Sequence, residues 1–145
     1  DGPGLVERSA RLGADLLERT KPLEERAVVR EVRGLGLMWA IEFEEPDGGS
    51  RTWKLLERIQ PGLFSQLVVV PLFRDHRILS QVAGHGLNVL KALPPLVATE
   101  DDLDWFASAL ETTVARAEKM PRALVRFAVG AARAGRTPRR KLARA

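Results

Sequence analysis

The stretch VVREVRGLGLMWAIEF, residues 28–43, decides the fold expected of this chain of 145 residues. Its first part, residues 28–32, predicts a short strand with valines on one side. Over residues 37–43 every second residue is large and apolar, which is the pattern of a strand with one buried face. Gly34 and Gly36 supply the backbone freedom for a tight connection between the two runs. The stretch therefore predicts two neighbouring strands of a sheet.

Helical patterns precede and follow this pair of strands. Residues 5–17 carry apolar side chains at steps of three and four, which places them on one stripe of a helix. That stripe consists of Leu5, Val6, Leu12, Leu16 and Leu17. Residues 52–74 have helical spacing in part, but Pro61 and Gly62 interrupt it. Residues 68–70, taken alone, fit a buried strand as well as a helix.

A second stretch, RILSQVAGHGLNVLKALPPLVATEDDLDWF, spans residues 77–106 and adds two more strands. Residues 77–82 and 88–92 are short enough and apolar enough for strands on either side of a glycine-rich loop. Pro94 and Pro95 end the second strand, because proline cannot donate to a strand ladder.

The last predicted element is a helix over residues 100–118. Thr99 is a favoured N-cap residue, and Asp102 follows three residues later, as in a capping box. The apolar face of this helix consists of Leu103, Phe106, Leu110, Thr113 and Val114. The whole order is helix, strand, strand, helix, strand, strand, helix. It predicts an α+β fold with helices on one face of a small antiparallel-type sheet.

Composition narrows the class of protein. The length suits one domain with its own core, and 45% of the residues are hydrophobic. Because the chain has no cysteine, disulfides and thiolate metal sites are excluded. No run approaches the roughly 20 apolar residues of a membrane span, and no signal-peptide pattern is present. We therefore expect a cytoplasmic protein.

The charge is distributed unevenly along the chain. Nine of the 23 Lys and Arg residues lie in residues 119–145, which contain no acid, so residues 1–118 hold 14 basic and 19 acidic residues. The pattern predicts a domain over residues 1–119, followed by a basic amphipathic helix and flexible tail over residues 120–145. Such a tail can contact a membrane or nucleic acid. The favoured alternative is that its apolar face docks on a neighbouring domain.

Together the stretches 28–43 and 77–106 resemble the C-terminal small domain of class III aminotransferases, of the ornithine and acetylornithine aminotransferase type. These are pyridoxal-phosphate enzymes of fold type I. The resemblance covers the chain up to about Lys119 and favours helix over most of residues 52–74. It implies reversible amino transfer between an amine or amino acid and an aldehyde or keto acid. It also implies a homodimer in which this domain closes the substrate cleft.

The parts that hold the cofactor have no counterpart in this sequence. No segment resembles the surroundings of the lysine that carries pyridoxal 5'-phosphate, or the acidic motif that contacts its pyridine nitrogen. The resemblance therefore implies that the cofactor binds mainly outside this chain, on a large domain that precedes it. The chain starts at Asp1 and its only methionines are Met38 and Met120, as expected of a trimmed product or excised domain. We expect no catalytic residue here and no activity from the fragment alone.

Two residues are candidates for substrate contact through the resemblance. Lys91, in NVLKALPPL, occupies a position where many class III aminotransferases carry an arginine that pairs with a substrate carboxylate. Lysine lacks the planar fork of arginine, which favours a substrate whose acceptor end is an aldehyde or ketone with no carboxylate held there. His85 lies between two glycines, in a loop that the resemblance puts near the mouth of the active site. For Lys91 the alternative is an exposed strand residue with no role.

Other chemical residues fit structural roles better. His76 and His85 are expected in loops without cysteine or paired carboxylates, so we expect no metal site. The Gly34–Gly36 turn lacks the third glycine of a dinucleotide-binding turn, and no serine lies in a nucleophile-elbow context. Trp39 and Trp53 are predicted in the core or an interface. Arg33 is predicted to be a structural ion-pair partner.

Two further functions stay open from the sequence. Relatives in the same family catalyse aminomutase or lyase steps with the same cofactor, and no residue here separates them from aminotransferases. The other possibility is a non-enzymatic binding module in which the acidic domain presents the basic tail to a membrane or nucleic acid.

Overall fold

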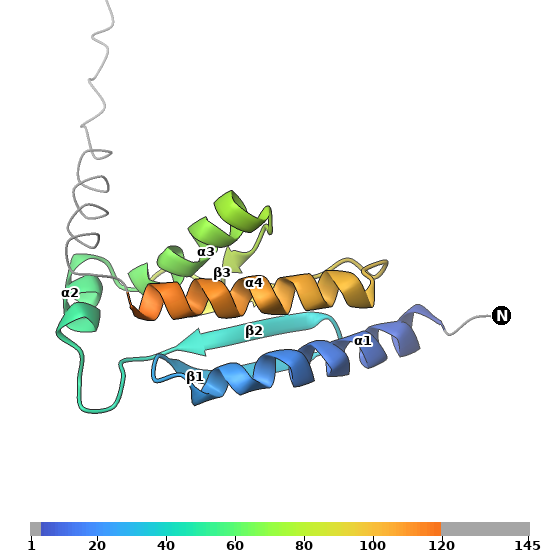
Figure 1. Cartoon of the computed structure of the whole chain (residues 1–145), viewed down its shortest axis with the longest axis horizontal. Helices are drawn as coiled ribbons and strands as arrows, with labels where there is room; N and C mark the ends of the chain where they lie inside the picture. Colours follow the sequence, from blue (N-terminus) through green and yellow to red (C-terminus); the bar gives the residue numbers. More distant parts are fainter. Residues whose placement is uncertain (1–3, 120–145) are drawn as a thin grey trace, which may run out of the picture.

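The computed structural model describes residues 4–119, which form a four-stranded sheet with helices packed against one of its faces (Figure 1). The elements are α1 (Leu5–Thr20), the 3₁₀ turn η1 (Lys21–Glu25), β1 (Val29–Leu35), β2 (Met38–Phe43), α2 (Arg51–Ile59), α3 (Leu63–His76), β3 (Gln81–Val82), β4 (Val89–Ala92) and α4 (Glu100–Glu118). The predicted α+β class with an antiparallel sheet is confirmed. The predicted tail helix lies outside the described residues.

The sheet has the strand order β1-β2-β4-β3, and every neighbouring pair is antiparallel. The first hairpin pairs Val32 with Ile41 and turns at Gly36, whose φ of +54° favours glycine. Gly34 was predicted to belong to this turn, but it lies within β1 opposite Trp39. One flexible residue is enough for the turn, so the strand continues one residue beyond Gly34.

The second pair of strands is shorter than the sequence pattern predicts. A strand was expected over residues 77–82, but β3 contains only Gln81–Val82. The cause is the end of α3, where Arg77 adopts a left-handed conformation and its N–H binds the Phe73 carbonyl. The N–H of Ile78 also binds the Leu72 carbonyl, so both N–H groups close the end of the helix around a left-handed cap residue. Residues 77 and 78 therefore terminate a helix and cannot begin a strand.

Helices fill the ambiguous region before this cap. The prediction of helix over most of residues 52–74 is confirmed, and residues 68–70 are helical. Pro61 and Gly62 divide the region into α2 and α3, with Gly62 at φ +78°. Ser50 caps α2 by accepting a hydrogen bond from the Trp53 N–H at 3.2 Å.

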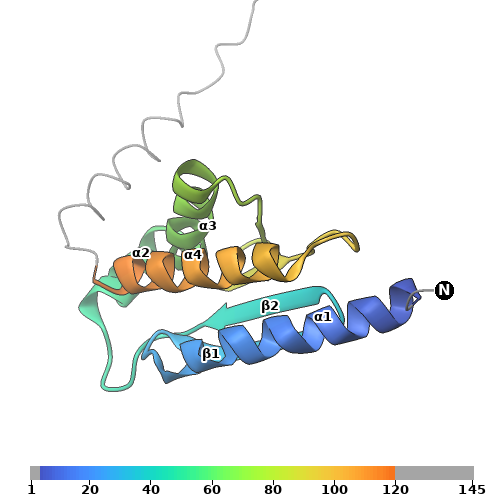
Figure 2. The same ribbon diagram turned by 45° about the vertical axis from the view of Figure 1, so that its right-hand side comes forward.

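The two longest helices, α1 and α4, lie side by side and run in the same direction (Figures 1 and 2). Ion pairs between the two segments advance in the same order along both: Arg11 with Glu100, Arg19 with Asp104, and Arg26 of the turn after α1 with Glu111 and Glu118. The predicted capping box of α4 is confirmed, since Asp102 N–H donates to Thr99 Oγ1 and Thr99 N–H donates to Asp102 Oδ2.

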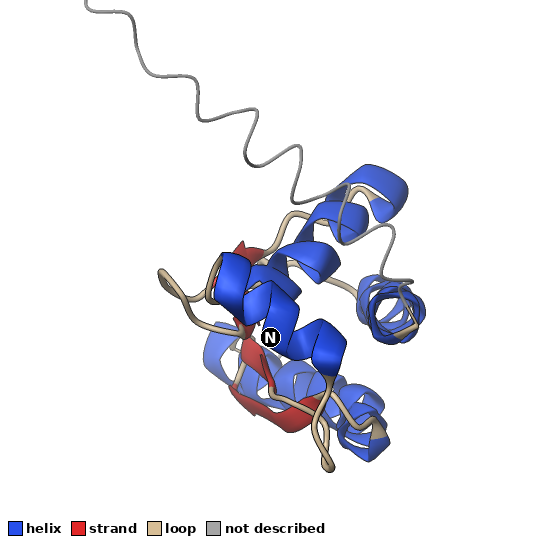
Figure 3. Cartoon of the chain, turned by 90° about the vertical axis from the view of Figure 1, so that its left-hand side faces the viewer, coloured by secondary structure: helices blue, strands red, loops and turns tan. Residues whose placement is uncertain are grey.

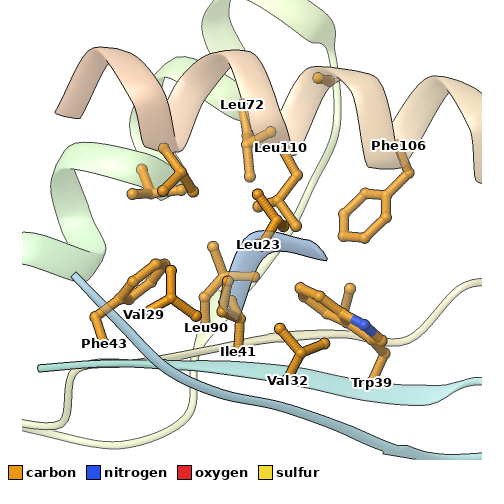
Figure 4. Packing of buried hydrophobic residues seen from close by; sticks show 14 of the residues in the cluster. Leu23, Val29, Val32, Trp39, Ile41, Phe43, Leu72, Leu90, Phe106 and Leu110 are labelled. Atoms are coloured by element: carbon orange, nitrogen blue, oxygen red, sulfur yellow. The ribbon is translucent and has the colours of Figure 1, made fainter. Parts of the chain in front are cut away.

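The core lies between these helices and one face of the sheet (Figure 4). All five residues predicted for the apolar face of α4 are buried. Phe106 meets Trp39 edge to face, with ring centroids 5.2 Å apart and an interplanar angle of 88°. The indole N–H of Trp39 donates to Thr20 Oγ1 at 2.9 Å, so its polar atom is satisfied inside the core.

The apolar stripe of α1 is only partly used. Leu12 and Leu16 are fully buried, whereas Leu5 and Val6 are 60% and 79% exposed. The first turn of α1 projects past the β1–β2 hairpin, so it has no sheet beneath it (Figure 1). The first two residues of the predicted stripe, Leu5 and Val6, therefore lie outside the core. No helix within residues 4–119 is long and apolar enough to cross a membrane.

Candidate functional site

The face of the sheet that points away from the helices carries charged side chains, and we call it the open face. Strands appear in red and helices in blue in Figure 3. Along β4, Leu90 and Ala92 are buried and the residues between and before them are half-buried. Because successive side chains of a strand point to opposite faces, Lys91 belongs to the open face.

Lys91 lies on one of the two inner strands. It is paired with Ala40 of β2 on one side and with Gln81 of β3 on the other. Ala40 contributes only a methyl group beside Lys91 on that side. Lys91 has no salt bridge to any carboxylate within residues 4–119.

The acid best placed to pair with Lys91 is already occupied. Glu42 lies two residues along β2 from Ala40, on the same face. Its carboxylate accepts hydrogen bonds from Arg30 at 2.9 Å and from Arg33 at 2.8 Å. The bond from Arg33 is the main cause that holds the pKa of Glu42 below its usual range, and Arg30 adds to it. The prediction that Arg33 is a structural ion-pair partner is confirmed.

This cluster predicts acid sensitivity of the fold. A lowered folded-state pKa gives a contribution to stability that is full above 4.5, the ordinary glutamate value, and is lost as the pH falls through the folded-state pKa. The unfolding free energy should decrease below pH 4.5, and this decrease should be about 0.5–1 kcal/mol smaller in Glu42→Gln than in the native chain. Urea titration at several pH values measures it. Glu25→Gln serves as the control, because Glu25 is exposed and forms no salt bridge within residues 4–119. Equal acid profiles for the native chain and Glu42→Gln would contradict the prediction.

His85 lies in the loop between β3 and β4, and its side chain is exposed. The loop is closed at its base by the Ala83 N–H, which donates to the Val89 carbonyl at 2.8 Å. Gly86 has φ +70°, so the turn depends on glycine there. The structure thus puts both candidates, His85 and Lys91, on one hairpin, but it records no contact between them.

The remaining candidates have structural surroundings. Trp39 and Trp53 are buried, as predicted. His76 was expected in a loop, but it is the last residue of α3 because the helix continues to the Arg77 cap. Within residues 4–119 no three His, Asp or Glu side chains gather as a metal-ligand cluster.

Two polar residues that the sequence analysis did not select, Glu57 and Asn88, form hydrogen bonds next to the hairpin loop. The Asn88 amide donates to Glu57 Oε1 at 2.7 Å, and Asn88 Oδ1 accepts from the Ser65 N–H at 3.4 Å. The Gly62 N–H also donates to Glu57 Oε1, at 3.2 Å. A single asparagine before a short strand is too common to signal this role in the sequence.

Comparison with known proteins identifies the family of this domain. The family model described as aminotransferase class III matches residues 2–114. The chain belongs to the class III aminotransferases. The resemblance inferred from residues 28–43 and 77–106 is thereby confirmed.

Several curated aminotransferases match this chain over only a part of their own length. Aminotransferase PigE of Serratia sp. is 27% identical over 141 residues, covering 74% of this chain and 16% of that protein. An ornithine aminotransferase of Bordetella pertussis is 31% identical over 114 residues, covering 77% of this chain and 22% of that protein. The chain therefore spans about a fifth of the length of these relatives.

Parts of larger solved structures have the same fold as this domain. An omega-transferase from Vibrio fluvialis JS17 superposes with a TM-score of 0.62 and 25% identity, covering 79% of this chain and 25% of that one. A transaminase from the marine bacterium Virgibacillus gives a TM-score of 0.66 at 20% identity over the same shares. The second likeness concerns the fold alone. Both agree with the fold of this domain, and the class III assignment rests on the family match.

Proposed function

We propose that this chain is the C-terminal small domain of a pyridoxal-phosphate-dependent class III aminotransferase. The complete enzyme would transfer an amino group between an amine or amino acid and an aldehyde or keto acid. The observation that carries the proposal is the family match over residues 2–114, together with a fold that superposes on a quarter of a transaminase. The match to aminotransferases does not favour the mutase, lyase or binding-module alternatives. A cytoplasmic location stays part of the proposal.

The described residues do not build a cofactor site by themselves. Pyridoxal 5'-phosphate supplies the electron sink of this chemistry, and it needs a lysine in an enclosed site with an acidic partner. Lys21 is paired with Glu24, and Lys54 with Glu45, and both lysine side chains are more than half exposed. Lys119 is exposed at the end of α4. Lys91 lies on the open sheet face. We therefore place the cofactor mainly outside this chain.

Our proposal assigns Lys91 and His85 to the substrate side of the complete enzyme. Lys91 offers an ammonium group that no carboxylate of residues 4–119 occupies, and it projects from a rigid inner strand. His85 is exposed at the end of the same hairpin. These residues would orient the substrate, while proton transfer belongs to groups outside this chain. A lysine there suits a polar oxygen of the substrate without the two parallel bonds that arginine gives a carboxylate.

The test is kinetic and uses the complete enzyme. Lys91→Ala should lower kcat/KM for the substrate by about tenfold or more, since a hydrogen bond to a charged group contributes about 1.5–3 kcal/mol. The apparent affinity for the cofactor should stay unchanged. Lys54→Ala is the matched control, because that lysine is exposed and paired with Glu45. Unchanged kinetics in Lys91→Ala would contradict the assignment, and transamination by the isolated chain with added cofactor would contradict the whole proposal.

We also propose that this domain packs against a preceding large domain within a homodimer. Its exposed apolar residues support such an interface. Leu79, Leu93 and Trp105 are 82%, 61% and 50% exposed and line one hollow of about 290 Å³. Exposed apolar clusters of this kind are typical of surfaces that contact another domain or subunit. No contact with a membrane or nucleic acid is needed to account for them.

A further inference from the structure

The first turn of α3 lies against the loop that carries His85. Gly62, which precedes α3, packs so closely that a Cβ added there would lie 2.9 Å from the Leu87 carbonyl oxygen and 3.0 Å from the Leu87 nitrogen. Pro61 packs against the same loop, because its Cβ lies 3.5 Å from where a Cβ added to Gly86 would be. The backbone of the α2–α3 junction and the backbone of the loop are therefore in direct contact.

Helix α3 has no N-terminal cap from its own sequence. Its N-cap residue is Gly62, and no side chain of the N-cap binds the first turn. The first N–H groups of a helix have no partner within the helix, so they need acceptors from elsewhere. Asn88 Oδ1 accepts the N–H of Ser65, and Glu57 Oε1 accepts the N–H of Gly62. Two residues distant in the sequence thus cap α3 together.

The same two residues are joined to each other and to the sheet. Asn88 Nδ2 donates to Glu57 Oε1 at 2.7 Å, and the Asn88 carbonyl accepts the Phe43 N–H at 2.7 Å. The Glu57 carboxylate is also favourably placed for the positive end of the α3 dipole. Asn88 therefore ties the end of the loop to β2, α2 and α3 at once.

We propose that Glu57 and Asn88 form a clamp that positions the loop of residues 83–87, and with it His85, for substrate contact. The flanking residues Gly84 and Gly86 have the widest conformational freedom of any residue type, so the loop backbone alone does not hold His85 in one place. The clamp supplies that restraint by fixing the loop end on the helix start. The role of the loop in substrate contact rests on the function proposed above, whereas the clamp itself does not.

Hydrogen exchange on the intact chain tests the clamp. Asn88→Asp keeps the shape of the side chain but puts a second carboxylate beside Glu57, so the two repel each other. We expect the amides of Gly62, Ser65 and Leu87, each of which has an acceptor in the structure, to exchange about tenfold faster or more, the change that about 1.4 kcal/mol produces. Gln66→Glu is the control: it adds one negative charge to the exposed side of the same turn and should leave these rates unchanged.

A compensating variant separates the clamp from general destabilisation. In Glu57→Gln combined with Asn88→Asp, the amide introduced on α2 can donate to the new carboxylate, which still accepts from Ser65. Exchange at Gly62, Ser65 and Leu87 should return to within about threefold of the native rate. Should Asn88→Asp fail to fold, Glu57→Ala gives the same readout, because it removes the acceptor. Unchanged exchange in the single variants, or no recovery in the double variant, would overturn the clamp.

Kinetics of the complete enzyme test the link to substrate. Asn88→Asp should raise KM while changing kcat little, as His85→Ala should, and the double variant should restore KM. An unaltered KM in a variant whose loop amides exchange faster would overturn the positioning of His85 for substrate while the clamp remains. Loss of transamination in every form, native included, would instead count against the proposed function.

Discussion

Replacing Gly13 with alanine should destabilise the domain by about 3 kcal/mol, the upper part of the range for overpacked cores. Gly13 is buried in the middle of α1, where alanine normally favours the helix by about 1 kcal/mol. Here a Cβ would lie 2.1 Å from the carbonyl oxygen of Gly36 and 2.3 Å from its carbonyl carbon. Both are backbone atoms of the hairpin turn, so no side chain can rotate away. The steric cost should therefore exceed the gain in helix propensity.

Relief of this clash requires α1 to move away from the turn. That movement would draw Leu12 and Leu16 out of the core, where both are fully buried. It would also weaken the hydrogen bond from the Leu37 N–H to Ser9 Oγ, which is 3.3 Å long. Urea unfolding followed by circular dichroism measures the loss. Ala14→Ser, on the exposed side of the same helix, is the control and should change stability little. A Gly13→Ala chain as stable as the native one would contradict the close approach.

The sequence indicated the helix that contains Gly13 but not the importance of this residue. The spacing of apolar residues and the positions of glycine and proline are local features of the chain. They predicted the helix of residues 5–17 and the strand of residues 37–43. The contact of Gly13 with Gly36 depends on how a helix crosses a hairpin 23 residues away, which no local pattern encodes. The exposed first turn of α1, with Leu5 and Val6 outside the core, has the same explanation. The local sequence pattern predicts a helix or strand, whereas the burial of each of its residues depends on the elements that pack against it.

The residues of the candidate site likewise include some that the sequence indicated and some that only the structure shows. Lys91 and His85 were found through resemblance, and the structure adds that they share one hairpin and that Lys91 faces away from the core. Glu57 and Asn88 were missed because their pairing joins α2 to the start of β4 through the folded structure alone. The length of the strand expected over residues 77–82 was overestimated. Arg77 has a left-handed backbone conformation, and because it is not a glycine the sequence does not signal this.

Phe106→Ala should cost about 3–5 kcal/mol, the usual loss for a buried aromatic side chain replaced by alanine. Phe106 is 6% exposed and packs edge to face on Trp39 (Figure 4). The indole N–H of Trp39 in turn donates to Thr20 Oγ1. Removing the Phe106 ring leaves a cavity where α4 meets the sheet, and it removes the aromatic pair. The same deletion should lower the urea midpoint without changing which residues are helical, because the capping box of α4 stays intact.

Trp105→Ala is the matched control, because the neighbouring residue on the same helix is also aromatic but is 50% exposed. Both changes replace a large aromatic residue by the best helix former, so their difference isolates burial from helix propensity. In the isolated chain Trp105→Ala should cost less than about 1 kcal/mol. Similar losses for the two variants would mean that Trp105 is covered in solution, by self-association through the apolar hollow that it lines. The same comparison therefore measures both the core under α4 and the surface proposed to meet the rest of the enzyme.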